Sequence, residues 1–492
     1  MRLPVSSNGI PSLHHSCQNS GDREIQASVL EQLQFSTLAL NQALLDNLAS
    51  LKYLQMTPIQ AQSLPLIVEG RDVIGQAKTG SGKTAAFGLG LLNKLNVKQF
   101  RVQSLILCPT RELADQVAKE IRSLARRIHN IKVLTLCGGV AFGPQKGSLQ
   151  HGAHIVVGTP GRIEEHLRKK NLKLNHLITF ILDEADRMLD MGFQPIINEI
   201  SNYLPVKRQT LLFSATFPGD IERMSKRLMK KPVRIEVDSE HDMASIQQIL
   251  YEIPDKGTRP TALIAVLQQH QPVSALVFCQ TKSLTEEIAA VLRDQGFMAL
   301  AIHGDLEQRD REVRLFQFTN KSLTVLVATD VAARGLDIDS LDLVINYHLT
   351  KDPEVHIHRI GRTGRAGTSG IACSLYHSSE AYKLELIEGF TGQILKPIPM
   401  PQFSSSNQPA QAPMVTLQID GGKKQKVRPG DILGALTGQN GIAGNQVGKI
   451  NIFEQSAFVA VERSVAKQAL AILSKGKLKG RSFRARRIKL SK

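Results

Sequence analysis

A short apolar run ends in the stretch Ala77-Lys78-Thr79-Gly80-Ser81-Gly82-Lys83-Thr84, and a helical pattern begins directly after it. Two glycines in a loop between a strand and a helix let backbone N–H groups close around a phosphate. Lys83 is placed to reach the β- and γ-phosphates of a nucleotide, and Thr84 to contact Mg²⁺. Ala77 stands where the usual motif has its first glycine, so an ordinary Gly-rich turn is the alternative. The strand–loop–helix context favours a nucleotide site formed by the whole stretch.

A second motif, Ile181-Leu182-Asp183-Glu184-Ala185-Asp186, places three carboxylates at the end of another apolar run. Open α/β sheets bind their ligands at the carboxyl ends of the strands. At such a position Asp183 can hold Mg²⁺, and Glu184 can polarise a water that attacks a phosphate. The alternative is that these acids only stabilise the start of the next helix. Together with Lys83, the two acids form the predicted catalytic edge of a nucleotide hydrolase.

Apolar runs rich in Val, Ile and Leu recur along the chain, and each is followed by a helical pattern. Buried parallel strands covered by helices have this pattern, so we predict two doubly wound α/β domains, each built on a parallel sheet. The first sheet is expected to contain residues 72–76, 104–108, 133–136, 154–157, 180–182 and 210–213. The second is expected to contain residues 275–279, 298–302, 324–328, 343–346 and 371–375.

Composition marks the boundaries between these domains. Residues 1–33 are polar and are expected to be a disordered extension, and a segment with few apolar residues and a Pro-Asp-Lys-Gly turn suggests a linker at 238–258. Five prolines with Ser, Gln and Asn at 397–413 predict a semi-extended tether. The domains are therefore expected at residues 34–237, 259–396 and 414–492.

Length and composition fit a globular protein of several domains, since 492 residues with 42% hydrophobic content can bury several cores. No apolar run approaches the roughly 18 residues of a membrane span, so we expect a cytoplasmic protein without membrane contact. The five cysteines show no CxxC spacing, and metal or disulfide chemistry is not expected from them.

The positive charge is concentrated at one end of the chain. The net charge is +17, and the residues from Ser404 onward hold 16 Lys and Arg against 4 Asp and Glu, which is +12. A concentrated positive charge indicates a polyanionic partner, usually nucleic acid. A solvated basic face or a disordered tail is the alternative.

Over residues 35–394 the sequence resembles the DEAD-box RNA helicases, with nearly every motif of that family in order. Phe35 and Thr57-Pro58-Ile59-Gln60 match the Q motif, which implies that Gln60 reads the adenine of ATP. The resemblance implies two RecA-like domains that hydrolyse ATP with Mg²⁺. In the first domain it implies RNA contacts from Arg111, Gly139, Thr159 and Arg162, and coupling of hydrolysis to unwinding by Ser214 and Thr216.

The second domain ends in His358-Arg359-Ile360-Gly361-Arg362-Thr363-Gly364-Arg365. Arginines at a domain edge that faces another domain's phosphate site can neutralise transition-state charge. A solvated arginine face is the alternative. The resemblance implies that Arg362 and Arg365 are arginine fingers and that His358 links the two halves of the site. It further implies the following contacts: Gln308, Arg311, Thr329 and Arg334 to RNA, and Asp337 to the ATP ribose.

Hydrolysis in such a divided site requires the two domains to close. In the family, closure bends one RNA strand and opens a short duplex, which is released after hydrolysis. The first-domain contacts go to phosphate and ribose, so the core is expected to bind RNA without sequence preference.

Residues 414–492 show a βαββαβ order and resemble an RNA recognition motif (RRM), a small α+β domain. The whole arrangement is similar to the DbpA subfamily, bacterial helicases directed to 23S ribosomal RNA, which implies a role with large-subunit precursor particles. Ser456 and Thr416 replace stacking aromatics of the motif, so base stacking on the sheet is in doubt. Binding is expected to depend mainly on basic side chains: Lys423, Lys424, Lys426, Arg428, Arg484 and Arg486, together with Arg481 and Arg487. A purely structural domain is the alternative.

We expect a monomer that acts on RNA and not on DNA. Three other functions remain open: a DNA-acting motor, an RNA-binding scaffold with an inactive ATPase, and a general RNA chaperone without a ribosomal target. The DNA motor is disfavoured by the Q motif, and the scaffold by the intact catalytic positions. Comparing ATPase stimulation by RNA and by DNA of equal length would test the DNA motor. Turnover at saturating RNA would test the inactive scaffold.

Overall fold

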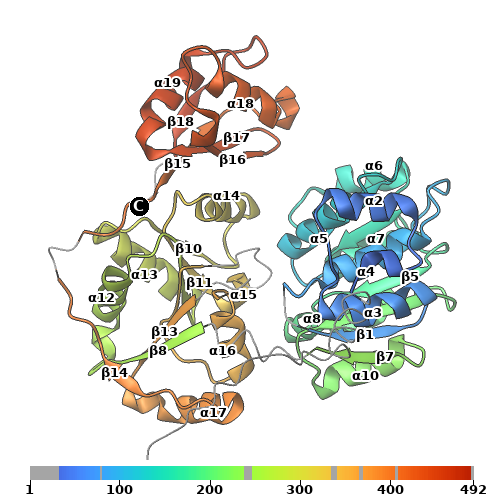
Figure 1. Cartoon of the computed structure of the whole chain (residues 1–492), viewed down its shortest axis with the longest axis horizontal. Coiled ribbons are helices and arrows are strands. Elements are labelled where there is room, and N and C mark those ends of the chain that lie inside the picture. The colour runs from blue at the N-terminus through green and yellow to red at the C-terminus, as the bar shows by residue number, and fades with distance from the viewer. Residues whose placement is uncertain are drawn as a thin grey trace, which may run out of the picture. The chain divides into compact units, whose positions relative to one another are not determined.

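The computed structural model describes residues 33–77, 80–237, 246–333, 341–364, 370–404 and 408–488. The chain divides into two units, Met1–Asp238 and Ser239–Lys492, which are described separately (Figure 1). The extension predicted at residues 1–33 lies outside the described residues except for its last position. Every helix in the described part of the chain is too short or too polar to span a bilayer.

A seven-stranded parallel sheet forms the centre of the first unit. In spatial order its strands are β3 (Val133–Leu136), β4 (Ile155–Gly158), β2 (Ser104–Leu107), β5 (Thr179–Leu182), β6 (Gln209–Ser214), β1 (Val73–Gln76) and β7 (Val233–Glu236). Six of these strands lie where the apolar runs predict them. The edge strand β7 was not predicted, because its alternating Val-Arg-Ile-Glu sequence lacks the continuous apolar character of a central strand.

Helices cover both faces of this sheet. One face is packed by α2 (Gln42–Ser50), α3 (Pro58–Glu69), α4 (Lys83–Lys94) and α5 (Arg111–Leu124), and the other by α7 (Pro160–Arg168), α8 (Ala185–Asp190), α9 (Gln194–Ser201) and α10 (Gly219–Leu228). Another helix, α6 (Phe142–Gln150), follows β3, and a single turn, η1, spans Phe35–Thr37. The doubly wound α/β class is thereby confirmed for this unit.

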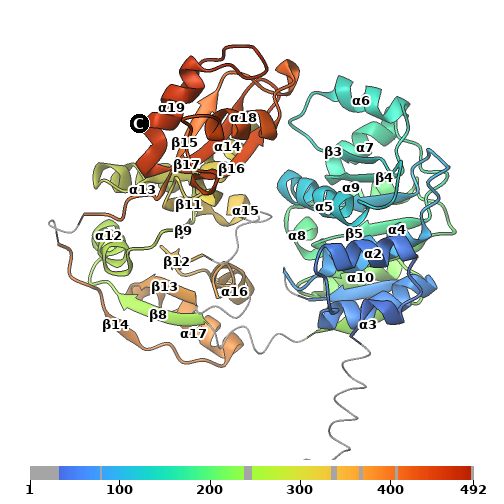
Figure 2. The same ribbon diagram turned by 45° about the horizontal axis from the view of Figure 1, so that its top comes forward.

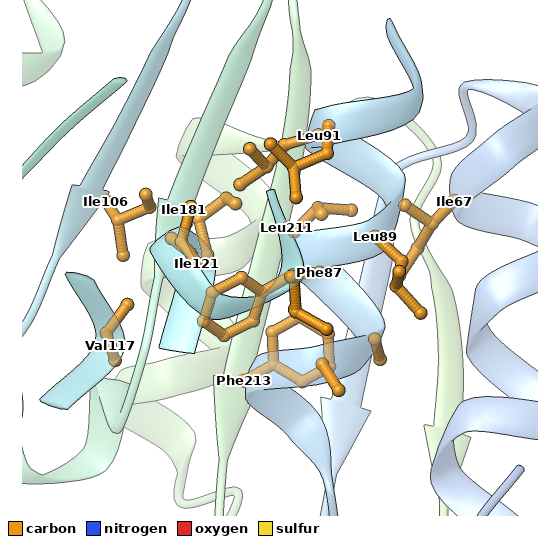
Figure 3. Packing of buried hydrophobic residues seen from close by; sticks show 14 of the residues in the cluster. Ile67, Phe87, Leu89, Leu91, Ile106, Val117, Ile121, Ile181, Leu211 and Phe213 are labelled. Atoms are coloured by element: carbon orange, nitrogen blue, oxygen red, sulfur yellow. The ribbon is translucent and has the colours of Figure 1, made fainter. Parts of the chain in front are cut away.

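Successive strand residues point to opposite faces, so both faces need apolar side chains. On β6, Phe213 lies in the α2–α5 core and Leu212 in the α7–α10 core. Figure 3 shows Phe213 beside Phe87 of α4, with ring centroids 5.4 Å apart. Gly75 on the neighbouring β1 makes room for this ring, because a Cβ at Gly75 would lie 2.5 Å from Cε1 of Phe213.

The second unit begins with another seven-stranded parallel sheet. In spatial order its strands are β10 (Ala299–Ile302), β11 (Val325–Thr329), β9 (Ala275–Cys279), β12 (Leu343–Asn346), β13 (Gly370–Tyr376), β8 (Ile246–Glu252) and β14 (Pro397–Pro399). One face is covered by α12 (Arg259–His270) and α13 (Lys282–Asp294). The other is covered by α14 (Gln308–Thr319), α15 (Asp330–Ala333), α16 (Pro353–Ile360) and α17 (Ala381–Thr391).

Two segments expected to be linkers contribute strands to this sheet. Within the linker expected at 238–258, Ile246–Glu252 forms β8, which pairs with β13 over seven residues. The glutamines Gln247 and Gln248 interrupt the apolar run by which a central strand is predicted. Pro397–Pro399, the start of the expected tether, forms β14 and lies beside β8 (Figure 2). Prolines are compatible with an edge strand, where one side of the backbone needs no partner. The tether is thus anchored at its first residues.

The C-terminal domain has the predicted βαββαβ order: β15 (Met414–Ile419), α18 (Pro429–Thr437), β16 (Val447–Ile452), β17 (Ala457–Glu462), α19 (Ala466–Lys475) and β18 (Ala485–Arg487). Its antiparallel sheet has the order β16-β17-β15-β18. Val415, Leu417 and Ile419 face the helices and form the core. Thr416 and Gln418 therefore lie on the outer face, opposite Ala460 and Phe458 of β17.

The outer face of this sheet packs against α14 and the residues that follow it. Phe458 is 1% exposed, and its ring centroid lies 6.2 Å from that of Phe316 in α14. Thr416 is also buried: its Oγ1 accepts a hydrogen bond from Nδ2 of Asn320 at 3.0 Å and is bonded to the Ser322 hydroxyl. Thr416, which replaces an aromatic of the usual RRM, is therefore a contact residue between domains.

Thr416→Val keeps the shape of this side chain but removes the hydroxyl, leaving the buried Asn320 amide without its acceptor. We expect a loss of about 1–3 kcal/mol at the interface, measured as faster amide hydrogen exchange in β15 and in the residues after α14. Thr437→Val, which removes a hydroxyl bonded to Leu433 of its own helix at 2.9 Å, is the matched control. Unchanged exchange in Thr416→Val would show that the hydroxyl cluster does not hold the domains together.

Candidate active site

Three adjacent strands bring the predicted catalytic groups to one edge of the first sheet. The order β5-β6-β1 places the residues that follow these strands next to one another. Asp183 follows β5, Ser214 ends β6, and the loop that leads to Lys83 follows β1. This edge is the carboxyl edge of a parallel sheet, where ligands bind in open α/β folds.

The loop after β1 is held by the Q-motif residues. Gly80 and Gly82 have φ angles of 85° and 94°, which favour glycine. The Thr57 hydroxyl donates to the Ser81 carbonyl at 2.8 Å, and Nε2 of Gln60 donates to the Gly82 carbonyl at 3.0 Å. The Gln60 amide thus supports the phosphate loop directly, and its reading of adenine remains a prediction.

Three further residues of the predicted nucleotide site are Phe35, Lys78 and Thr79. Lys78 and Thr79 lie outside the described residues. Phe35 is 5% exposed and packs in the core beneath α2–α5. Its contact with the nucleotide therefore remains a prediction.

Lys83 begins α4 and is buried, with its ammonium donating to the carbonyl of Ala77. Burial lowers the pKa of Lys83, and the nearby carboxylates, Asp183 first among them, act in the opposite direction. The ammonium thus lies at the start of the helix and next to the catalytic acids. This is the position that a phosphate-binding lysine requires.

Asp183 and Glu184 have different surroundings although they are neighbours. Burial raises the pKa of Asp183 to about 7, against the opposing effect of Lys83. Glu184 stands at the N-cap of α8 with a φ of 53°, and its carboxylate accepts a hydrogen bond from Arg187 at 2.9 Å. Both members of this pair are about 5% exposed. Arg187 therefore holds the Glu184 side chain in place, and a carboxylate at this position can accept a proton from water.

Asp186 connects the acidic motif to the end of β6. Its Oδ2 accepts hydrogen bonds from the backbone N–H groups of Ala215 and Thr216, both at 3.0 Å, and from the Thr216 hydroxyl at 3.3 Å. The Ser214 hydroxyl accepts from the Asp186 N–H at 3.2 Å. A movement of Ser214 and Thr216 would therefore be transmitted to the acidic motif through four hydrogen bonds.

The predicted RNA contacts of the first unit also lie together. Thr159 is the N-cap of α7, and Nη1 of Arg162 donates to the Val140 carbonyl at 3.0 Å. The guanidinium of Arg111 lies against Gly139, whose φ is 72° and where any Cβ would overlap the guanidinium. The structure therefore brings the arginines of α5 and α7 to the same loop after β3.

In the second unit, Gln308 and Arg311 lie in the first turn of α14, and Thr329 ends β11. Asp330, which follows Thr329, forms a bidentate ion pair with Arg359 at 2.6 and 2.8 Å. Arg362 is 4% exposed, and His358 lies on α16. Arg334, Asp337 and Arg365 lie outside the described residues, so their predicted roles are untested.

The sequence interpretation assigned no role to Arg187, Asp186 or Arg359. Arg187 carries no signal of its own, because a basic residue after an acidic motif is an ordinary helix residue. The role of Asp186 could have been predicted from the acidic motif, since an acid three residues after Asp183 can face the residues that follow the neighbouring strand β6. The pairing of Arg359 with Asp330 depends on the order of β11 and β12 in the sheet, which the sequence does not specify.

Comparison with known proteins agrees with this geometry. Residues 57–224 match the DEAD/DEAH box helicase model, residues 258–367 the helicase conserved C-terminal domain, and residues 416–487 the DbpA RNA binding domain. The ATP-dependent RNA helicase DbpA of Escherichia coli (strain K12) is 53% identical over 456 residues, covering 92% of this chain and 99% of that protein.

This chain belongs to the DEAD-box family of ATP-dependent RNA helicases. A CshA helicase of Listeria monocytogenes is 42% identical and covers 76% of this chain and 72% of its own. The structure of Saccharomyces cerevisiae Dbp5 L327V bound to RNA and ADP BeF3 has a TM-score of 0.69 and 30% identity, and covers 75% of this chain and 96% of that one. The resemblance predicted from the motifs is confirmed, and the chain is a DbpA-like, RNA-dependent ATPase with an RNA-binding C-terminal domain.

In this helicase, Glu184→Gln removes the carboxylate that can accept a proton from the attacking water. We expect RNA-stimulated ATP hydrolysis to fall by at least about 100-fold, with ATP and RNA binding retained. Turnover and nucleotide binding should be measured together with thermal unfolding, because the change also weakens the pair with Arg187. Glu199→Gln on the exposed side of α9 is the control, and wild-type turnover in Glu184→Gln would refute the assignment.

Proposed function

We propose that this helicase locally unwinds short RNA duplexes in 23S ribosomal RNA during assembly of the large ribosomal subunit. The observation that supports the target is the match of residues 416–487 to the DbpA RNA binding domain. The high identity of the whole chain to Escherichia coli DbpA supports it further. The helicase core supplies ATP-driven strand separation, and the C-terminal domain supplies the choice of RNA.

Hydrolysis is proposed to need groups from both units. Lys83 and Glu184 belong to the first unit, and Arg362 and Arg365 to the second. Arginines of the second unit would then reach the phosphates only on closure, which RNA favours by binding both units. Turnover would thereby depend on RNA.

Mg²⁺ is the metal that the family implies, and the oxygen donors of this site fit it. Thr84 and Asp183 would hold it, and Asp183 is a buried carboxyl group whose pKa is raised to about 7 by burial. Hard divalent cations prefer such oxygen ligands. When bound, the ion neutralises charge on the phosphates.

Arg365→Ala should separate the transition-state role of this side chain from substrate binding. A group that acts on developing charge is expected to lower the maximal RNA-stimulated rate by about 10³-fold with little change in KM for ATP. Arg293→Ala is the control, since its guanidinium bonds the Ala299 carbonyl within its own domain. Loss of ATP affinity with an unchanged maximal rate would make Arg365 a ground-state contact.

The C-terminal domain is proposed to bind RNA through a groove at one end of its sheet. The outer face, where an RRM usually stacks bases, is covered at Phe458 and Thr416 by the helicase domain. A groove beside it is lined by Lys424, Lys426, Lys479 and Arg481. Among the described residues that line it, Asp431 is the acid that partly offsets these positive charges, and it pairs with Lys479 at 3.2 Å. Phosphates are expected to bind there.

The basic side chains of β18 are the other candidates. Arg486 lies opposite Gln418, which places it on the outer face, and it pairs with Asp420 at 2.6 Å. Arg484 immediately precedes this strand. Both belong to the basic set expected to hold RNA, so the groove and β18 need to be compared directly.

Two double variants of the full-length protein make this comparison. Lys424→Ala with Arg481→Ala should require at least about tenfold more of a 23S fragment from the peptidyl-transferase region for half-maximal ATPase stimulation, while a generic duplex stimulates as before. If Arg484→Ala with Arg486→Ala has this effect instead, β18 is the recognition element. Equal stimulation of the unaltered protein by both RNAs would reject ribosomal targeting and favour a general RNA chaperone.

A further inference from the structure

A buried glutamine in α6 uses both ends of its side-chain amide. Gln145 is 6% exposed, and its Nε2 donates to the Cys137 carbonyl at 2.9 Å. Its Oε1 accepts from Nη1 of Arg162 at 3.1 Å and lies 3.0 Å from Nε2 of His166. One amide therefore joins the end of β3 to two side chains of α7.

The partners of Gln145 determine which form of His166 is present. The opposite orientation of the Gln145 amide would direct its NH₂ at the Arg162 guanidinium and its oxygen at the Cys137 carbonyl, so it is excluded. With Oε1 toward the imidazole, Nε2 of His166 must carry the proton and donate. Burial, followed by the nearby Arg162, lowers the pKa of His166 to about 4, which keeps the imidazole neutral.

Aromatic packing holds His166 in this position. Its ring stacks on Phe142 of α6, with centroids 4.3 Å apart and planes inclined by 11°. Nζ of Lys169 lies 4.3 Å from the centroid of Phe142. His166 is fully buried, so water does not compete for its hydrogen bond to Gln145.

These contacts converge on groups expected to receive RNA. Cys137 directly precedes Gly138 and Gly139, and Arg162 also donates to the Val140 carbonyl on the other side of that turn. Nε of Arg162 lies 3.2 Å from Glu165. The bonds to Val140, Gln145 and Glu165 use Nε and Nη1, and within the described residues Nη2 has no partner, so it is available to a phosphate oxygen.

We propose that Gln145 and His166 are positioning residues for RNA: they hold the Arg162 guanidinium and the Gly138–Gly139 turn in one arrangement before RNA binds. The proposal rests on the proposed function and on the RNA contacts that the family resemblance implies for Arg162 and Gly139. A guanidinium fixed in advance loses less conformational freedom on binding a phosphate. Removing Gln145 or the proton that His166 donates should therefore weaken RNA binding while leaving the chemistry of ATP hydrolysis intact.

The test uses three substitutions in the full-length protein, with single-stranded RNA of generic sequence as the probe. Gln145→Met removes both roles of the amide at similar volume. His166→Phe keeps the stacking on Phe142 but removes the donor, whereas His166→Gln keeps a donor and removes the stacking. ATPase activity is measured against RNA concentration.

Gln145→Met and His166→Phe are expected to raise the RNA concentration for half-maximal stimulation about tenfold, with the rate at saturating RNA and KM for ATP within about twofold of wild type. For His166→Gln this RNA concentration should lie within about threefold of the wild-type value, because the glutamine can still donate the hydrogen bond. Arg168→Ala, on an exposed part of the same helix and paired with Glu164 at 3.0 Å, should leave the RNA dependence unchanged. Thermal unfolding identifies a variant that has lost its fold. Among folded variants, equal RNA dependence of His166→Phe and His166→Gln would contradict the role of the hydrogen bond.

Arg162→Ala separates the predicted RNA contact of Arg162 from the positioning role of Gln145 and His166. If Arg162→Ala leaves the RNA dependence unchanged, the RNA contact predicted for Arg162 is wrong. If Arg162→Ala weakens RNA binding but Gln145→Met and His166→Phe do not, only the positioning role is overturned. Gln145→Met combined with Arg162→Ala should lose no more RNA affinity than Arg162→Ala alone, since both act through the same guanidinium.

Discussion

Within the described residues, three acidic side chains share the buried carboxyl edge of the first sheet with the cations Lys83 and Arg187. Asp183, Glu184 and Asp186 are each at most 6% exposed, as are Lys83 and Arg187. Away from water, each charge needs a partner. Asp186 accepts hydrogen bonds from backbone N–H groups of the turn after β6, and Glu184 forms an ion pair with Arg187. Asp183 is left with the least compensation, so its pKa is raised, and the order of β5, β6 and β1 is what makes this arrangement possible.

A single helix of the second unit serves two surfaces. Gln308 and Arg311 at the start of α14 are the predicted RNA contacts, while Arg309 reaches Ser456 and Phe316 packs on Phe458 of the C-terminal domain. Because these residues belong to one rigid helix, a shift of the C-terminal domain and a shift of the RNA-facing turn are mechanically linked. The small side chains at Ser456 and Thr416 allow this close approach, and larger aromatics at these positions would occupy the same space.

Sequence alone predicted the central strands and the motif residues for one physical reason. Central parallel strands are continuous apolar runs, and the residues that follow them carry the chemistry. Two strands near one side of the second sheet escaped this criterion, because β8 begins with Ile-Gln-Gln and the edge strand β14 is Pro-Ile-Pro. Gln145 and His166 escaped as well, since they act through contacts between α6 and α7 that no spacing within the chain reveals.

The pairing of β14 with β8 also sets a length. Because Pro397–Pro399 belongs to the sheet, the connection to β15 starts only at Met400 and ends at Pro413. Fully extended, these residues span on the order of 50 Å. The connection therefore has a fixed maximum length: even if the C-terminal domain were to leave α14, the start of β15 could lie no farther than this from the end of β14. The length of this connection thus limits how far apart the C-terminal domain and the second parallel sheet can lie along one RNA.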